Sequence, residues 1–427
     1  MTSQNDAMND KRLRLTINVL LVVYIFNFLD RQIVGILAQP IARELHLSDL
    51  HIGLMTGFAF AIFYTGLGIP IARYADRPST SRVKVIAVCL VVWSAMTAVC
   101  GAAQTFVQLF LARVGVGIGE AGGTPPAHSL IAEMASPEKR SSALSLYQLG
   151  PPLGGLIAMV MGGYLADTIG WRWAFVVVGA PGILLSLVVL TMLRDPRSDG
   201  TAQQYSKAPQ VSFAEALAHI WASRAIRLIL PSVAFAAIAN FGMMIWGPIF
   251  LQRSFGLSAH VTGLWFGLAN GIGSALGVWY GGQLGDRLIK RGKQYLMSGP
   301  AICLALCCPL LVAGLLVPDW RLAILLFFPG IGLLWLHVGP AYSAVQGLVP
   351  TTSRATASAA ILLMQNLFGL GLGAPLIGKL SDHFKPELGV DSVRYVLVVL
   401  VGVVTLAAAV LQWRSRKYLP DELDRAV

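Results

Sequence analysis

Long apolar stretches recur along the whole chain and leave only short polar segments between them. As a helix, each stretch of about 20 residues is long enough to cross a hydrocarbon core of about 30 Å. The pattern therefore predicts an all-α membrane protein. Its twelve predicted transmembrane helices lie at residues 15–37, 51–74, 84–103, 107–131, 141–166, 173–193, 226–251, 260–285, 296–316, 321–345, 355–381 and 393–413.

The longest polar segment separates the first six predicted spans from the last six. We therefore expect an N-terminal six-helix half at 1–193, a cytoplasmic linker at 194–225 and a C-terminal six-helix half at 226–427. The linker ends in a stretch that predicts a helix lying in the membrane interface, with a plain linker as the alternative. Its apolar face would carry Phe213, Leu217, Ile220 and Trp221.

The composition agrees with a membrane protein and gives its orientation. Only 12% of the residues are charged, against about 25% in soluble domains. Most of the 32 Lys and Arg residues fall on the side of the N-terminus, which predicts that both termini are cytoplasmic. This bias accounts for the net charge of +11, so no nucleic-acid partner is expected. The first apolar run is longer than the core of a signal peptide, and we expect it to be an uncleaved helix.

Several features that could indicate other chemistry are better explained by packing. The five cysteines all fall in predicted spans without metal-ligand spacing, so no metal or cofactor is expected. Gly117, Gly119 and Gly122 form a G-x-G-x-x-G pattern, but no strand precedes it, and close helix packing is the better explanation. Pro125 and Pro126 predict a kink just after it. No set of residues typical of an active site occurs, so an enzyme is not expected.

A short signature closes the second, fifth, eighth and eleventh predicted spans. It reads ARYAD at 72–76, GYLAD at 163–167, GQLGD at 282–286 and GKLSD at 378–382. The first and third copies lie 210 residues apart, about half the chain. Because the second and fifth spans run in opposite directions, their signatures fall on opposite membrane faces. This predicts inverted three-helix repeats within two parallel six-helix halves.

Longer motifs resemble known transporters. ARYADRPSTSRVK, GGQLGDRLIKRGK and GWRWAF resemble the major facilitator superfamily, although Ala72 and a missing Gly-Arg-Arg ending depart from its pattern. NFLDRQ, ARVGVGIGEAGGTPPAHS and YQLGPPLGG resemble the bacterial branch of the Spinster family, whose animal members export lysolipids or sphingosine 1-phosphate. The resemblance implies two rocking halves, a monomer, and the bacterial inner membrane. It also implies a cytoplasmic gate that latches the outward-open state, formed by Asp76, Arg77, Asp286 and Arg287.

Four ionisable residues, Asp30, Arg31, Arg113 and Glu120, fall inside predicted spans. Each would cost about 2.5–3.5 kcal/mol at the centre of a lipid-facing helix, so they must face one another or a wet cavity. The helix rise places Asp30 and Arg113 at similar depth, and Arg113 and Glu120 share a helix face. We expect Asp30 or Glu120 to pair with Arg113, depending on conformation and protonation.

This cluster predicts the chemistry of a proton-coupled transporter. Burial favours the neutral form of a carboxylate and a nearby guanidinium favours the charged form, so Asp30 and Glu120 are the expected proton-coupling groups. Arg113 and, less directly, Arg31 would anchor an anionic headgroup, because a guanidinium stays charged and binds phosphate or carboxylate through two N–H groups. The alternative is a permanent ion-pair network that sets the helix register.

The C-terminal half is instead rich in aromatic and Met residues, which suits the chain of an amphiphile. For any single one of these side chains, packing is the alternative, and His337 fits a satisfied buried histidine as well as a proton carrier. The predicted substrate pocket consists of Asn27, Tyr64, Asn240, Phe241, Trp246, Asn270, His337 and Gln365.

The leading hypothesis is a secondary transporter in the lipid bilayer that moves a lysolipid-like or other amphipathic anion by alternating access, with the proton as coupling ion. A symporter for small organic anions is one alternative, and a multidrug exporter, which would prefer cations, is another. A membrane sensor or scaffold without transport is the alternative from another class. The residues also leave Na⁺ open as the coupling ion.

Overall fold

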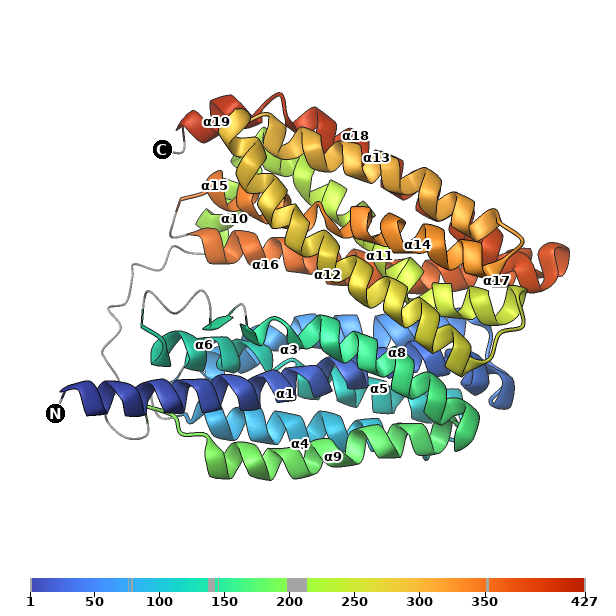
Figure 1. The fold of residues 1–427 in the computed structure, drawn as a ribbon, viewed down its shortest axis with the longest axis horizontal. Helices are drawn as coiled ribbons and strands as arrows, with labels where there is room; N and C mark the ends of the chain where they lie inside the picture. The colour runs from blue at the N-terminus through green and yellow to red at the C-terminus, as the bar shows by residue number, and fades with distance from the viewer. Residues whose placement is uncertain are drawn as a thin grey trace. The chain divides into compact units, whose positions relative to one another are not determined.

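The computed structural model describes residues 2–75, 77, 80–136, 143–144, 146–197, 213–350 and 353–425, and the regular elements among them are all helical. They are shown in Figure 1 and comprise α1 (Thr2–Glu44), α2 (Asp49–Gly53), η1 (Leu54–Phe58), α3 (Ala59–Ala75), α4 (Arg82–Cys100), α5 (Phe106–Glu120), α6 (Thr124–Met134), α8 (Gly150–Thr168), α9 (Gly170–Met192), α10 (Phe213–Ala222), α11 (Arg224–Ser254), α12 (Ala259–Arg291), α13 (Tyr295–Leu316), α14 (Trp320–Trp335), α15 (Val338–Gly347), α16 (Arg354–Met364), η3 (Gln365–Gly373), α17 (Ala374–Leu388), η4 (Gly389–Asp391), α18 (Ser392–Ser415) and α19 (Leu419–Arg425).

Nine helical stretches among the described residues are long and apolar enough to cross a membrane. The last of them, Thr356–Ser415, contains two of the predicted spans. The predicted spans 107–131 and 141–166 are not among the nine. The first is divided between α5 and α6, and the second is described as a continuous helix only from the start of α8. The all-helical membrane fold is confirmed, and the count of twelve spans stays a prediction.

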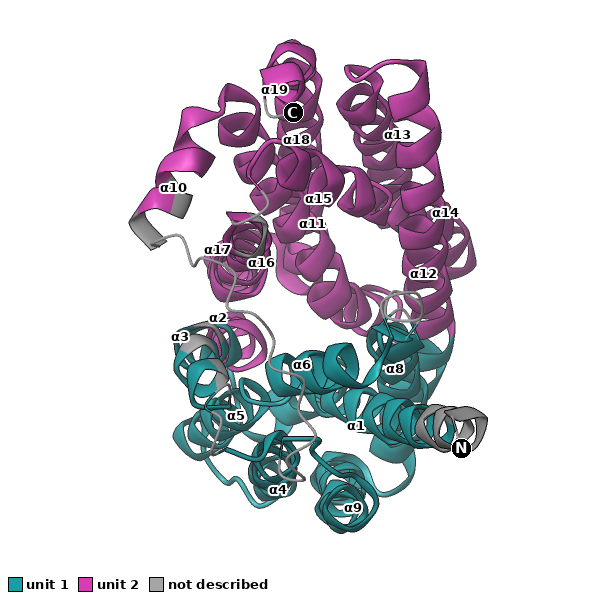
Figure 2. Cartoon of the chain, turned by 90° about the vertical axis from the view of Figure 1, so that its left-hand side faces the viewer, with its two compact units in different colours: residues 1–47, 59–204, 258–264 teal, residues 48–58, 205–257, 265–427 magenta. Residues whose placement is uncertain are grey.

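The chain forms two compact units, coloured separately in Figure 2. Unit 1 consists of Met1–Leu47, Ala59–Gln204 and Ser258–Leu264, and unit 2 of Ser48–Phe58, Tyr205–Leu257 and Trp265–Val427. Two short segments therefore depart from the predicted division into halves. Ser48–Phe58 comes from the first half of the sequence and belongs to unit 2, and Ser258–Leu264 comes from the second half and belongs to unit 1.

Glycines bring the helices of unit 1 into close contact. Helix α8 packs on α1, and a Cβ at Gly154 would lie 2.4 Å from the carbonyl oxygen of Ile25. Helix α5 packs on α4, and a Cβ at Gly119 would lie 2.6 Å from the backbone nitrogen of Trp93. Gly117 approaches the backbone of Phe60 on α3 in the same way. The G-x-G-x-x-G pattern is thus a packing surface, as the sequence predicted.

The helix that carries this pattern breaks where a kink was predicted. Helix α5 ends at Glu120, and α6 begins at Thr124 with prolines in its first turn. Pro125 and Pro126 lack the N–H that a continuing helix would need, and their fixed backbone angle suits a helix start. The two prolines therefore lie in the first turn of α6. Glu120 is the last residue of α5, just before the break between the two helices.

Unit 2 is built around α11, which packs on α18, while α13 packs on α18 and α14. Two short helices are attached to it. Ile220 of α10 is 3% exposed and Leu419 of α19 is fully buried, and both belong to one apolar core. Trp221 is exposed. The side chains of Phe213 and Leu217 lie outside the described residues, so the predicted apolar face of this helix stays a prediction.

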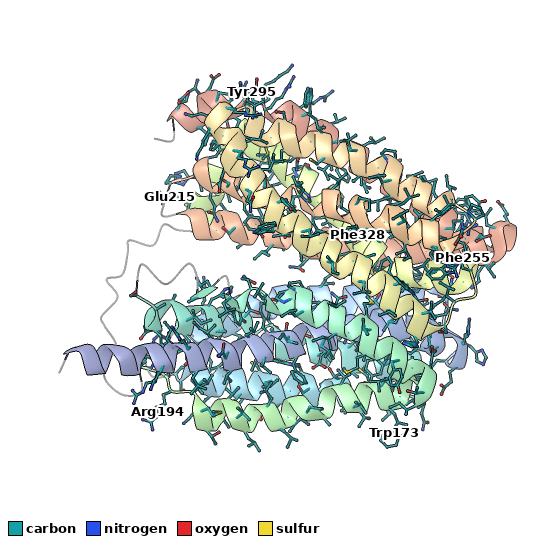
Figure 3. All side chains as sticks on the ribbon, viewed as in Figure 1. Trp173, Arg194, Glu215, Phe255, Tyr295 and Phe328 are labelled. Carbon is teal, nitrogen blue, oxygen red and sulfur yellow. The ribbon has the colours of Figure 1, made fainter. Side chains whose placement is uncertain are left out.

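The exposed surface of the helices is also apolar. Leu184, Leu325 and Val399 are each at least 65% exposed, and Figure 3 shows Trp173 pointing outward from α9. A helix that is apolar on its buried and exposed sides alike belongs in a hydrocarbon environment. The protein is therefore an integral membrane protein that crosses the bilayer several times.

The glycine contacts give a direct test of the packing. Gly119→Ala forces the backbones of α4 and α5 apart and should destabilise the protein by about 1–3 kcal/mol. Gly66→Ala is the matched control, because a Cβ there meets nothing within 4 Å and Ala favours the helix by roughly 0.5–1 kcal/mol. Thermal unfolding of the purified protein in detergent measures both. Equal melting temperatures for the two variants would contradict the contact.

Candidate functional site

A buried ion pair joins α1 and α5 inside unit 1. The Nε and Nη2 atoms of Arg31 donate to Oε2 of Glu120 at 3.0 and 2.6 Å. The side chains of Arg31 and Glu120 are 11% and 0% exposed, so water screens their attraction weakly. Asn27, one turn before Arg31, accepts a further hydrogen bond from Nη2 through Oδ1 at 3.3 Å. Hydrogen bonds between ionised partners are about twice as strong as neutral ones.

Aromatic rings surround the same guanidinium. The Cζ atom of Arg31 lies 4.5 Å from the ring centre of Phe28, 4.2 Å from that of Phe60 and 5.0 Å from that of Tyr64. A cation over the face of an aromatic ring is stabilised by the negative charge on that face. The three rings therefore stabilise the positive charge of Arg31 in addition to its pairing with Glu120.

Arg113 of α5 contacts the backbone of α1 rather than a carboxylate. Its Nη1 atom donates to the carbonyl oxygen of Asp30 at 3.2 Å, and Nη2 donates to that of Arg31 at 3.4 Å. The side chain is fully buried, and its Nε atom has no hydrogen-bond partner. Arg113 thus holds α1 at the level of the charged residues and keeps unused hydrogen-bonding capacity.

Asp30 is fully buried, and neither of its carboxyl oxygens has a hydrogen-bond partner. The hydroxyl of Thr97 and the indole N–H of Trp93, both on α4, lie close enough to interact with this carboxyl group, but neither forms a hydrogen bond of normal geometry. Buried polar groups are normally hydrogen-bonded. Four groups around Asp30 depart from this rule: its carboxylate, the Thr97 hydroxyl, the indole N–H of Trp93 and the Nε–H of Arg113.

From the sequence, we expected Asp30 or Glu120 to pair with Arg113. The structure shows that neither carboxylate does so. Glu120 is paired with Arg31, and Arg113 reaches the carbonyl of Asp30 but not its carboxylate. The similar depth of Asp30 and Arg113 was correctly inferred. The rotation of α1 about its axis decides which atoms meet, and helix rise alone does not give that rotation.

The predicted pocket residues of unit 2 do not form one cluster of hydrogen bonds. Trp246 is fully buried and donates through Nε1 to the carbonyl oxygen of Ala374 at 3.2 Å, which makes it a packing residue. His337 is 2% exposed, and its Nδ1 lies 2.6 Å from the carbonyl oxygen of Leu334, while Nε2 has no partner. Gln365 accepts from Tyr342 at 3.5 Å. Asn240 is buried, and Phe241 and Asn270 are half-buried.

The predicted cytoplasmic gate is only partly described. Asp76 lies outside the described residues. Arg77 is exposed and lies over the ring of Tyr74, with 5.6 Å between Cζ and the ring centre. Asp286 and Arg287 are exposed, and the described part of the chain offers them neither an ion pair nor a hydrogen bond. Their role in gating stays a prediction.

A buried ion pair in unit 2 was not predicted from the sequence. Arg253 donates through Nη1 and Nη2 to the two carboxyl oxygens of Asp49 at 2.8 and 2.7 Å. Ser381 donates to the same carboxylate at 2.6 Å. Asp49 and Arg253 fall just outside the predicted spans 51–74 and 226–251, where charged residues are ordinary. Only their shared position at one end of the predicted helices could have indicated the pair.

Comparison with known proteins gives consistent matches over the whole chain. The model of the Major Facilitator Superfamily matches residues 20–373. An MFS-type efflux pump of Mycolicibacterium smegmatis is 34% identical over 428 residues, covering 100% of this chain and 98% of the relative. Protein spinster homolog 1 of Xenopus tropicalis is 26% identical over 436 residues, covering 93% of this chain and 81% of the relative.

A solved structure matches closely as well. It is the crystal structure of a bacterial homologue of the human lysosomal transporter Spinster, in an inward-facing and unoccupied conformation. The TM-score is 0.88 at 30% identity, and the match covers 96% of this chain and 98% of the other. The likeness to the Spinster branch, inferred above from short motifs, is confirmed.

The Arg31–Glu120 pair makes a testable statement about stability. Arg31→Ala leaves Glu120 buried without a positive partner and should cost about 3–5 kcal/mol. The double variant Arg31→Ala/Glu120→Gln removes that unpaired charge and should recover a large part of the loss. A double-mutant cycle on unfolding in detergent measures the coupling. Additive losses would show that the two side chains do not stabilise each other.

Proposed function

We propose that this chain, which belongs to the Major Facilitator Superfamily of membrane transporters, couples proton movement to the transport of an amphipathic anion. It is a transporter and not an enzyme. The observation that carries the proposal is the contrast between the two buried carboxylates of unit 1. Glu120 is paired with Arg31, while neither carboxyl oxygen of Asp30 forms a hydrogen bond of normal geometry.

The proton is assigned to Asp30 in the state described here. An ionised carboxylate buried without any donor is costly, whereas the protonated form is neutral and needs less from its surroundings. Arg113 stands next to it with its two Nη atoms on backbone carbonyls. A small rotation that turns these N–H groups onto the carboxylate would stabilise the ionised form and release the proton. Asp30 would thus gain and lose a proton as the conformation changes.

Arg31 is the better placed of the two arginines to bind an anionic headgroup. Its side chain is 11% exposed and Arg113 is fully buried, so an entering anion reaches Arg31 with less rearrangement. A phosphate or carboxylate would replace Glu120 on the two N–H groups that now form the ion pair. Protonation of Glu120 would favour that exchange. Binding and protonation would then be linked through one guanidinium.

The lipid-like character of the substrate rests on the aromatic environment and on the relatives. Phe28, Phe60 and Tyr64 border the guanidinium, so a headgroup there would sit next to apolar surface. The match to a bacterial homologue of Spinster extends over nearly the whole chain. We therefore propose a lysophospholipid-like anion as the substrate, with the protein acting as a monomer in the bacterial inner membrane and both termini in the cytoplasm.

Drug export is the second candidate, and one observation favours it. The relative that is 34% identical over the full length is described as an MFS-type efflux pump. An exporter of cationic drugs would use Glu120 or Asp30 as the binding group rather than Arg31. The two functions therefore predict opposite charge preferences at the same cluster.

Ligand binding to the purified protein distinguishes these functions. We expect a lysophosphatidylglycerol to bind, and Arg31→Ala to weaken binding by about 10- to 100-fold, because a hydrogen bond to a charged group contributes about 1.5–3 kcal/mol. Binding should vary between pH 5 and 8 in the wild type and lose that variation in the double variant Asp30→Asn/Glu120→Gln. Arg77→Ala, at an exposed arginine, should bind like the wild type.

The other outcomes are informative in different ways. Binding of a short organic acid but no lysolipid would overturn the substrate and retain proton coupling. Binding of a lipophilic cation that is lost in Glu120→Gln would favour drug export. Unchanged binding and transport in all of the cluster variants would show that the charged residues only hold the helices in register.

A further inference from the structure

Two of the four repeated signatures cap helices that come from distant parts of the chain. In the GKLSD copy, Asp382 accepts hydrogen bonds from the backbone nitrogens of Asp49 at 2.9 Å and Leu50 at 2.8 Å. In the GYLAD copy, Asp167 accepts from the backbone nitrogen of His260 at 2.8 Å. Each carboxylate thus satisfies free N–H groups at a helix start, where negative charge is also favoured by the helix dipole.

The glycine of each signature makes the cap possible. A Cβ at Gly378 would lie 2.2 Å from the carbonyl oxygen of Asp49, and a Cβ at Gly163 would lie 2.3 Å from that of Ala259. No other residue allows the backbones to approach this closely. The spacing of four residues then places the aspartate one helical turn further along the same face. The signature is therefore a structural device for holding the first turn of another helix.

The two capped turns are themselves a repeat. They read LSDLHIG at 47–53 and LSAHVTG at 257–263, which are 210 residues apart. Ser48 accepts from the backbone nitrogen of His51, and Ser258 from that of Val261. The closing glycines also correspond. A Cβ at Gly53 would lie 2.5 Å from the carbonyl oxygen of Ala374, and one at Gly263 would lie 2.1 Å from that of Met159.

Both capped turns lie in the two short segments, Ser48–Phe58 and Ser258–Leu264, that belong to a different unit from the residues around them in the sequence. The turn at Asp49 belongs to unit 2, and its helix continues through η1 into α3 of unit 1. The turn at Ala259 belongs to unit 1, and α12 continues in unit 2 from Trp265. Each cap therefore fixes the start of a helix whose remainder belongs to the other unit.

A third signature is free in the same structure. A Cβ at Gly282 would meet nothing within 4 Å, and Asp286 is exposed without a hydrogen-bond or ion-pair partner in the described part of the chain. The copy at 72–76 ends in Asp76, which is not described. The signature is thus compatible with two conditions, one engaged with a helix start and one free.

We propose that Asp167 and Asp382 are positioning residues of the transport cycle, which hold the helix starts at Ala259 and Asp49 in one state of the cycle and release them in the other. The proposal rests on transport by alternating access, as inferred above, but not on the substrate or on the coupling ion. The contacts suit reversible release, because they consist of a few hydrogen bonds and a close fit of glycine to backbone.

The caps formed by Asp382 and Asp167 differ in the number of contacts that support them. The turn at Asp49 is held additionally by Arg253, which donates two hydrogen bonds to the Asp49 carboxylate, and by Ser381. The turn at Ala259 has no side chain at the equivalent position that could form an ion pair. Loss of Asp167 should therefore release its turn more completely than loss of Asp382 does.

Cysteine labelling without substrate tests the proposal. The five native cysteines are replaced by serine or alanine, and a single cysteine is introduced at Ile52 or Thr262, both fully buried and 210 residues apart. A third reporter, Gly282→Cys, follows the free signature. The rate of reaction with a maleimide is measured on purified protein in detergent, together with the melting temperature.

We expect Asp382→Ala to raise labelling at position 52, and Asp167→Ala to raise labelling at position 262, each by about two- to thirtyfold, as expected for loss of a helix cap. Labelling at position 282 should fall in both, because opening one end closes the other. Glu387→Ala, which removes an exposed carboxylate from the same helix as Asp382, should change none of the three rates.

Two results would overturn the assignment. Unchanged labelling at positions 52 and 262 would show that the caps do not hold these turns. A rise at all three positions with a lower melting temperature would show a general loss of structure instead of a conformational shift. Neither result bears on lysolipid binding or on its pH dependence. The role of the two caps and the identity of the substrate can therefore be disproved independently.

Discussion

Asp30, Arg31, Arg113 and Glu120 lie inside unit 1 among apolar helices, and the need to satisfy these four charged groups determines how α1 and α5 meet. Arg31 and Glu120 satisfy it by pairing, and Arg113 satisfies it by bonding to two carbonyls of α1. Asp30 is left as the one carboxylate of the cluster whose two oxygens form no hydrogen bond of normal geometry. In the proposed function, the cost of that exception makes the site sensitive to a proton. A cluster in which each group was satisfied would hold the helices equally well and would have no reason to change with pH.

Small residues allow this chemistry to be placed inside the membrane. Gly117 and Gly119 bring α5 into close contact with Phe60 of α3 and Trp93 of α4, so the helices around the charged residues pack closely. The prolines after Glu120 end the helix at the level of the ion pair. Close packing and a helix break at one level give a rigid wall beside a segment that can rearrange. Transport requires both properties.

Much of this could be predicted from the sequence, because burying charge in lipid is costly wherever it occurs. That cost alone indicated that Asp30, Arg31, Arg113 and Glu120 face a protein interior, and the structure brings them together in unit 1. The partner of each charge was not predictable, since it depends on the rotation of each helix about its axis. For Asp49, the sequence offered even less. It lies at a helix end, where a charged residue needs no special explanation, and its partner Arg253 lies about 200 residues away.

The proposed function requires that Asp30 carries a proton while Glu120 is ionised, and infrared spectroscopy can distinguish the two protonation states. Spectra of the purified wild type at neutral pH would be compared with those of Asp30→Asn and Glu120→Gln. The account predicts a carbonyl stretch of a protonated carboxylic acid that persists in Glu120→Gln and disappears in Asp30→Asn. A band that disappears in Glu120→Gln instead, or a wild type whose spectrum in this region matches that of Asp30→Asn, would contradict it.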